Sequence, residues 1–155
     1  MRFAYSSNAY RRWSIDEAIE RIAGIGFCGF ELMADEPHAW PATMTPAAID
    51  TLKRNIERSG LTISNVNAFM MNAVQDFWHP SWIEPDAEFR RLRVEHTKAS
   101  LRMAARLGAQ TISTEPGGPL PMGMSRGSAL DMFTAGLRES LRVAEEVGVM
   151  LLVEP

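Results

Sequence analysis

Short apolar runs alternate with longer stretches of helical period along the whole chain. The apolar runs are RFAYS near the start, then CGFELM, LTISNVNAF, AQTISTE and VMLLVE, and each is typical of a short buried strand. Between them, apolar residues recur at helical spacing over residues 14–26, 45–60, 86–107 and 128–147. The pattern therefore predicts five strands and four helices in the order β-α-β-α-β-α-β-α-β.

The ends of the helical stretches carry capping residues. Ser14 and Glu17 form a capping box, Thr45 precedes a proline at the first helical position, and Gly108 and Gly148 close the last two helices. The apolar stripes expected to face the core are Phe89, Leu92, Ala99, Met103 and Leu107 in the third helix, and Leu130, Phe133, Leu137, Leu141 and Ala144 in the fourth.

Strict alternation of strands and helices predicts an α/β protein with a parallel sheet and right-handed crossovers. Two architectures have this order, an open doubly wound sheet and a (β/α)8 barrel. The open sheet usually has a glycine-rich first turn that binds a nucleotide. Here the first turn reads SSNAYRRW, without such glycines, and this favours the barrel. We then expect each strand to pair with its neighbour in the sequence.

Polar side chains follow several of the predicted strands at the edge where a parallel barrel forms its active site. The second strand delivers Glu31, the third Asn65 and Asn67, the fourth Glu115 and the fifth Glu154. Converging carboxylates repel each other unless a cation or a shared proton offsets their charge. Oxygen-rich sites suit magnesium or manganese. Each glutamate taken alone can also be a solvated acid at a strand end.

Three motifs carry a resemblance to a known group of enzymes. GIGFCGFELM after the first helix, RLGAQTISTEPGG at the fourth strand and AEEVGVMLLVEP at the fifth resemble the amino-terminal half of the xylose isomerase-like TIM-barrel superfamily. The resemblance implies one domain over residues 1–155, an incomplete barrel with about five strands and four helices of the eight-fold fold. It also implies a metal-dependent isomerase or epimerase of sugars or sugar phosphates that acts by proton transfer next to a carbonyl.

In that superfamily, the glutamate ending the fifth strand binds the metal and works as an acid or base, and Glu154 occupies the matching position. The resemblance implies a divalent ion, Mn²⁺, Mg²⁺ or Co²⁺. Its other ligands, typically an aspartate, a histidine and a second glutamate, come from strands six to eight. Those strands are absent from these 155 residues, so the resemblance also implies that the chain alone is inactive.

Contacts to the substrate are expected from Glu31, Asn67, His79 and Glu115. His79 lies in a long connection, residues 68–84, whose other aromatic residues are Phe69, Phe77, Trp78 and Trp82. Connections of this length are often functional, and apolar walls with a few polar groups suit a sugar. The alternative is that these aromatic residues pack on the rim of the barrel.

Three other functions remain open at this point. A metal-dependent dehydratase or lyase needs the same chemistry on the same scaffold, and a non-catalytic sugar-binding remnant agrees with the missing strands. A DNA-repair endonuclease of the same superfamily is disfavoured, because it has histidines near the ends of the third and fourth strands. Those places read VNAF and STEPGG here.

Composition and charge limit the partners that this chain can be expected to bind and indicate its location in the cell. With 155 residues, 46% hydrophobic, the chain can bury a core, and a charge of −3 gives no electrostatic basis for binding nucleic acid or an anionic membrane. No apolar stretch approaches the roughly 20 residues of a bilayer span. The absence of a signal peptide and the single cysteine, Cys28, indicate a cytoplasmic protein. Open edge strands with apolar inner residues, expected at Leu151 and Val153, can pair with another chain, so a homo-oligomer is possible.

Overall fold

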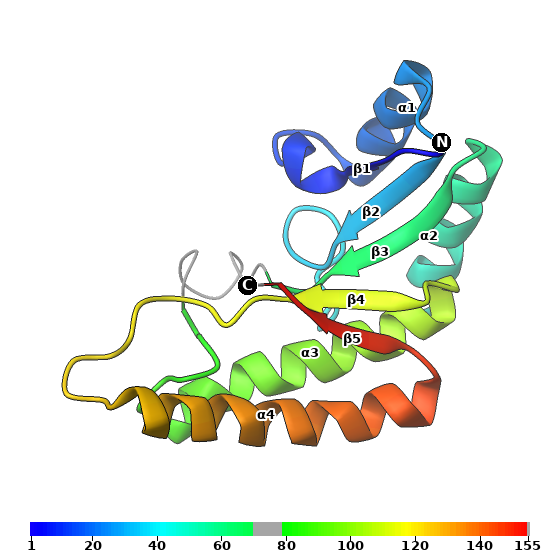
Figure 1. Ribbon diagram of the computed structural model, residues 1–155. Helices are drawn as coiled ribbons and strands as arrows, with labels where there is room; N and C mark the ends of the chain where they lie inside the picture. The colour runs from blue at the N-terminus through cyan, green and yellow to red at the C-terminus, as the bar shows by residue number, and fades with distance from the viewer. Residues whose placement is uncertain (70–78, 155) are drawn as a thin grey trace.

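Five parallel strands form one sheet in the computed structural model, which describes residues 1–69 and 79–154. The strands are β1 (Ala4–Ser6), β2 (Gly29–Met33), β3 (Thr62–Asn67), β4 (Thr111–Thr114) and β5 (Met150–Val153). They pair in the order β1-β2-β3-β4-β5, each beside its neighbour in the sequence (Figure 1). This order confirms the predicted partial barrel, because a doubly wound sheet has its first strand in the interior.

The four helices cover one face of this sheet. They are α1 (Ile15–Ile25), α2 (Pro46–Arg58), α3 (Ala87–Leu107) and α4 (Arg126–Val147), and a short 3-10 helix, η1 (Ser7–Tyr10), follows β1. The main hydrophobic core joins strand residues to residues of all four helices, including Phe30, Leu32, Val66 and Ile112 from the sheet and Ile22, Ile56, Leu101 and Ala144 from the helices. Figure 1 shows the helices along one side of the curved sheet, as in the wall of a barrel.

The predicted caps form as expected. The Ser14 hydroxyl accepts the amide hydrogen of Glu17, and the Glu17 side chain accepts that of Ser14, which completes the capping box of α1. The Thr45 hydroxyl accepts a hydrogen bond from the amide of Ala48 at 3.2 Å and so caps α2. Gly108 and Gly148 end α3 and α4 with φ of 85° and 69°, a conformation that glycine adopts without strain.

The buried faces of α3 and α4 differ from the predicted stripes. Leu92, Leu130 and Leu141 are exposed, whereas the buried face of α3 includes Arg93, His96, Thr97, Ser100, Leu101 and Ala104. The hydroxyls of Thr97 and Ser100 donate to the carbonyls of Arg93 and His96, one turn back, at 3.0 and 2.8 Å. Since the hydroxyls of these small polar residues form their hydrogen bonds within the helix, the residues can be buried without an apolar pattern.

Within the described residues, no helix has the length and apolarity needed to cross a membrane.

The prediction that Leu151 and Val153 lie on the inner face of β5 is wrong. Leu151 pairs with Ile112, which is completely buried, and packs against the core on the side of the helices. Because side chains alternate along a strand, Met150 and Leu152 take the inner face, and they are 63% and 39% exposed. Val153 pairs with Thr114, whose side chain bonds Trp82, so Val153 belongs to the outer face as well.

The close packing of Trp82 against Gly136 predicts that alanine at position 136 destabilises the protein, although alanine is the better helix former. Alanine is favoured over glycine inside a helix by about 0.5–1 kcal/mol. At Gly136, however, a methyl group would lie 2.8 Å from Cε3 of Trp82, which is fully buried. We therefore expect Gly136→Ala to lower the free energy of unfolding by about 1–3 kcal/mol, as overpacking does. Gly24→Ala is the matched control, since its added methyl group meets nothing within 4 Å and should stabilise. Equal effects in urea denaturation would contradict this account.

Candidate active site

Glu115 and Glu154 lie side by side at the edge where the strands end. They directly follow Thr114 and Val153, which are register partners, and the amide of Glu154 donates to the carbonyl oxygen of Thr114 at 2.8 Å. The Thr114 hydroxyl is turned toward the helices, where it accepts a hydrogen bond from Nε1 of Trp82 at 3.1 Å. Since side chains alternate along a strand, both carboxyl groups belong to the opposite, inner face.

Glu115 and Glu154 interact through their charges. Burial raises the pKa of the Glu115 carboxyl, the charge of Glu154 raises that pKa further, and the guanidinium of Arg93 opposes both effects. Glu154 itself is exposed at this edge. Two carboxylates that repel each other form an arrangement that a divalent cation or a shared proton stabilises.

Glu31 lies deeper in the sheet than the sequence indicated. It is the middle residue of β2 and does not end the strand, and a register shift between Phe30 and Glu31 aligns it with Asn65. Nδ2 of Asn65 donates to Oε2 of Glu31 at 2.9 Å and to Oγ of Ser113 at 2.8 Å. The hydroxyl of Thr111 donates to Oδ1 of Asn65 at 2.8 Å. Glu31 therefore belongs to a polar network across β2, β3 and β4, below the Glu115–Glu154 pair.

The other two predicted substrate contacts are Asn67 and His79. Asn67 ends β3 and is 8% exposed, and its Oδ1 accepts a hydrogen bond from the amide of Phe69 at 3.1 Å. His79 has a half-buried side chain with Nε2 at 3.9 Å from Oε1 of Glu84. Glu84 in turn accepts a hydrogen bond from the amide of Ser81 at 2.7 Å. Neither residue belongs to the carboxylate pair, and their roles stay predictions.

The aromatic residues of the long connection mainly pack within the protein where the structure describes them. Phe69 and Trp82 are 3% and 0% exposed, as the packing alternative predicted. The ring of Trp82 lies edge-on to Phe133 of α4 at a centroid distance of 5.8 Å. Phe77 and Trp78 lie outside the described residues.

Sequence reasoning missed Arg93 and gave only a structural role to His96. Arg93 is a charged residue with 1% exposure, and His96 is 6% exposed and stacks on Trp40 at a centroid distance of 4.8 Å. Among the described residues, Nε2 of His96 has no hydrogen-bond partner. His38, which precedes α2, is also buried, with 7% exposure, and its Nε2 lies 3.3 and 3.2 Å from the carbonyl oxygens of Tyr10 and Trp13.

His96 predicts a pH dependence of stability. Burial and the nearby charge of Arg93 lower the pKa of His96 to about 3, although a hydrogen bond with the Ala68 backbone opposes them. The unfolded chain binds a proton near pH 6.5, so the native state loses stability as the pH falls from 6.5 toward 3. Between pH 6 and 4, we expect the free energy of unfolding to fall less steeply in His96→Gln than in the wild type, by about 1 kcal/mol per pH unit. Parallel slopes in denaturation titrations would contradict a neutral buried His96.

Comparison with known proteins agrees with this geometry. The family model described as "Xylose isomerase-like TIM barrel" matches residues 19–155. This chain belongs to the xylose isomerase-like TIM-barrel family. The match covers most of the chain, including both Glu115 and Glu154. Comparison with curated protein sequences gives no significant match.

Solved structures extend the likeness to the whole fold. A D-tagatose 3-epimerase-like protein superposes with a TM-score of 0.78 at 22% identity, over 99% of this chain and 52% of that protein. D-psicose 3-epimerase from Clostridium cellulolyticum with D-tagatose gives a TM-score of 0.73 at 19% identity, over 98% and 52%. A Thermus thermophilus protein soaked with ZnCl2 gives 0.66 at 26% identity, over 98% and 54%. The chain therefore spans about half the length of these similar proteins.

The described residues contain no complete set of metal ligands. Over residues 1–69 and 79–154, no three histidine, cysteine, aspartate or glutamate side chains are placed to hold one ion. The Glu115–Glu154 pair nevertheless offers the carboxylate oxygens that hard divalent cations prefer. Family resemblance assigns the remaining ligands to strands six to eight, and the sheet described here contains five strands. The residues present fit one side of such a site.

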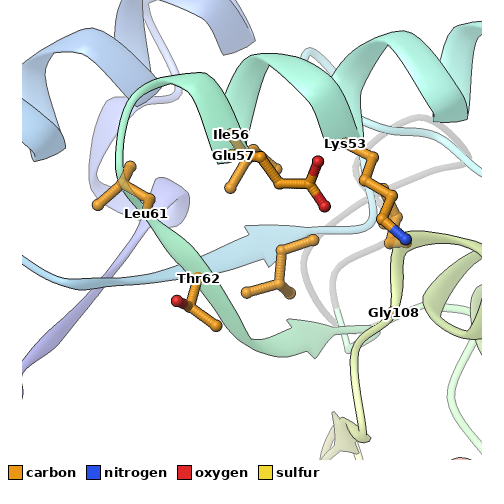
Figure 2. Close-up of a pocket in the computed structure, with 8 residues that line it drawn as sticks. Lys53, Ile56, Glu57, Leu61, Thr62 and Gly108 are labelled. Carbon is orange, nitrogen blue, oxygen red and sulfur yellow. The ribbon is translucent and has the colours of Figure 1, made fainter.

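A separate hollow of about 290 Å³ lies at the other edge of the sheet (Figure 2). Lys53 and Glu57 of α2, Thr62 at the start of β3 and Gly108 after α3 help to line it. Because Thr62 begins its strand, this hollow lies at the amino-terminal end of the sheet, the end that contributes stability in barrels of this kind. It is therefore not the candidate active site.

Proposed function

We propose that this chain is the amino-terminal part of a metal-dependent sugar isomerase or epimerase. One observation carries the proposal: Glu115 and Glu154 are neighbours on the inner face, at the carboxyl edge of a xylose isomerase-like sheet. Active sites of parallel barrels form at that edge. Two of the similar structures are described as a D-tagatose 3-epimerase-like protein and as a D-psicose 3-epimerase with D-tagatose. Both of these sugars are ketoses.

Glu154 has the central role in the proposed reaction. Its exposed carboxylate follows β5 at the position that binds metal in the family, so it would hold one side of a Mn²⁺, Mg²⁺ or Co²⁺ ion. When bound, such an ion supplies polarisation of the sugar's carbonyl and hydroxyl oxygens. The Glu154 carboxylate then removes or returns the proton at the carbon next to the carbonyl. Its location at the open end of the sheet gives a substrate access to it.

The remaining predicted contacts would orient the sugar. Glu115, beside Glu154, can accept hydrogen bonds from substrate hydroxyls, and His79 would reach the same end of the barrel from the segment before α3. Glu31 lies in the network with Asn65, so it would act from below the substrate. The side-chain oxygen of Asn67 accepts the hydrogen bond from the amide of Phe69, so its amide group would be the part that donates to a sugar hydroxyl. Phosphorylation of the sugar stays an expectation of the resemblance.

A cytoplasmic location is part of the proposal and rests on the single cysteine, Cys28, which is not paired in the described structure. The expected partner is a small sugar. Nucleic acid is not expected, because the net charge is −3. Pairing with a second copy of the chain stays a prediction.

The proposal is tested by proton exchange. The full-length protein is incubated with Mn²⁺ and a panel of ketoses in deuterium oxide, and the sugars are analysed by NMR and mass spectrometry. We expect deuterium at the carbon next to the carbonyl of at least one sugar, together with its epimer or isomer. A product lighter by one water would support the dehydratase or lyase instead. Binding of a sugar without any exchange would support the sugar-binding remnant.

A further inference from the structure

Arg93 is a buried cation close to the candidate site. It lies in the second turn of α3, it is 1% exposed, and its guanidinium lies over the ring of Phe69 at 5.5 Å from the centroid. Burial lowers the pKa of Arg93 to about 10, so it is charged at neutral pH. A buried charge is costly and is retained only where hydrogen bonds and opposite charges surround it.

The Arg93 guanidinium holds both sides of the connection between β3 and α3. Its Nη1 donates to the carbonyl oxygens of Ala68, at 3.3 Å, and of Phe69, directly after β3. Its Nε donates to the carbonyl oxygen of Pro80 at 3.0 Å, on the other side of the connection. The planar fork of arginine can hold several acceptors in one fixed geometry, which a lysine ammonium cannot.

The segments that Arg93 binds contact the chain on both sides of Glu115, at the end of β4 and in the turn after it. Before it, the Thr114 hydroxyl accepts the hydrogen bond from Nε1 of Trp82 at 3.1 Å. After it, Gly117 packs so closely that a Cβ there would lie 3.3 Å from Cβ of Ser81 and 3.8 Å from Cε2 of Phe69. The backbone on both sides of Glu115 therefore contacts Phe69, whose carbonyl Arg93 binds, and Ser81 and Trp82, which directly follow the bound carbonyl of Pro80.

We propose that Arg93 is a positioning residue for Glu115, acting through the segments at 68–69 and 80–82 that hold the end of β4. The effect of Arg93 on turnover rests on the proposed function. Its effect on the backbone around Glu115 rests on geometry alone. Charged groups around Arg93 are Asp35 from the β2–α2 connection, Glu84 before α3 and Glu115 itself, and His96 is the neutral neighbour on its own helix. The negative charges of these acids stabilise the buried guanidinium.

The first test needs no substrate. Amide hydrogen exchange is measured by mass spectrometry in the full-length protein, its Arg93→Met variant and the control Arg102→Met, an exposed arginine of the same helix. We expect faster exchange over residues 79–86 and 111–118 in Arg93→Met, with no change there in Arg102→Met. Wild-type exchange over 111–118 in a folded Arg93→Met protein would overturn the proposal.

Two milder variants keep the test valid if Arg93→Met does not fold. Arg93→Lys retains the charge without the fork, and Trp82→Phe keeps an aromatic ring, although a smaller one, and removes the hydrogen bond to Thr114. Both should raise exchange over residues 111–118. If neither variant changes exchange in that segment, the proposal is wrong.

The second test uses a double-mutant cycle on the exchange reaction proposed above. A misplacement of about 1 Å of a group that orients the substrate for reaction can cost about a hundredfold in rate, so we expect a loss of about that size in kcat for Arg93→Met, with a smaller change in KM. In a Glu115→Gln background, the same substitution should have almost no further effect. Losses that multiply would show that Arg93 acts only on the fold. If the wild type catalyses no deuterium exchange into any sugar, the proposed function fails. The amide hydrogen exchange of the first test then decides alone whether Arg93 positions the backbone of Glu115.

Discussion

Replacing Glu154 by glutamine is expected to reduce turnover of the full-length protein by about a thousandfold while the fold stays intact. The amide is nearly the same shape, but it cannot take a proton at neutral pH and it binds a divalent ion weakly. Glu154 is exposed and follows β5, so its loss removes no core contact. The variant should therefore show wild-type unfolding together with a near-complete loss of activity.

The measurement is solvent deuterium incorporation into the ketose that the wild type accepts, with Mn²⁺ in excess. Glu146→Gln is the matched control, because it removes the same charge from an exposed position of α4. It should retain wild-type turnover. Near-normal exchange in Glu154→Gln would remove this residue from the mechanism.

The 155-residue chain expressed alone is expected to lack isomerase activity and to associate or aggregate. A barrel of this type closes with eight strands and about 250 residues. Over the residues that the structure describes, β1 and β5 each have one unpaired edge, and Met150 and Leu152 are 63% and 39% exposed on the inner face of β5. Exposed edges with apolar side chains favour pairing with another chain. The metal would also lack the ligands expected from later strands.

Oligomeric state, thermal unfolding and Mn²⁺ affinity of residues 1–155 test this expectation together. Leu152→Lys, which places a charge on the inner face, should reduce association, and Leu130→Lys, on the exposed side of α4, should not. A monomer with a cooperative melt and micromolar manganese affinity would contradict the account of an open half-barrel.

Strand order and helix ends followed from the sequence because they depend on local chemistry. The capping box at Ser14 and Glu17 and the glycine at position 148 act within a few residues of the chain. Alternation of strands and helices then restricts the topology, since single helical crossovers make neighbouring strands parallel. Glu115 and Glu154 were found at the same edge because both directly follow short apolar runs.

The register of β2 could not be predicted in this way. The shift between Phe30 and Glu31 depends on pairing with β3, a segment more than thirty residues away. It places Glu31 beside Asn65, below the end of the sheet. A single residue of shift changes which side chains are neighbours, and apolar periodicity does not report such a shift.

Arg93 and part of the buried faces of α3 and α4 were missed for a different reason, although Met103, Leu107 and Ala144 are buried as predicted. A pattern that counts apolar residues assigns an arginine to the solvent, yet Arg93 is buried because three backbone carbonyls and nearby acids offset its desolvation. Leu92 and Leu130, assigned to the core, are exposed. Such positions are decided by contacts between distant segments, which only the folded chain brings together.

The central claim is that Glu154 forms one side of a divalent metal site at which a proton is transferred next to a sugar carbonyl. The most direct measurement is deuterium exchange by the full-length protein after removal of metal with a chelator, followed by graded addition of Mn²⁺. The account predicts that exchange disappears with the metal and returns in proportion to the bound Mn²⁺, and that Glu154→Gln does not recover under the same conditions. Exchange that continues unchanged in the metal-free protein would contradict it.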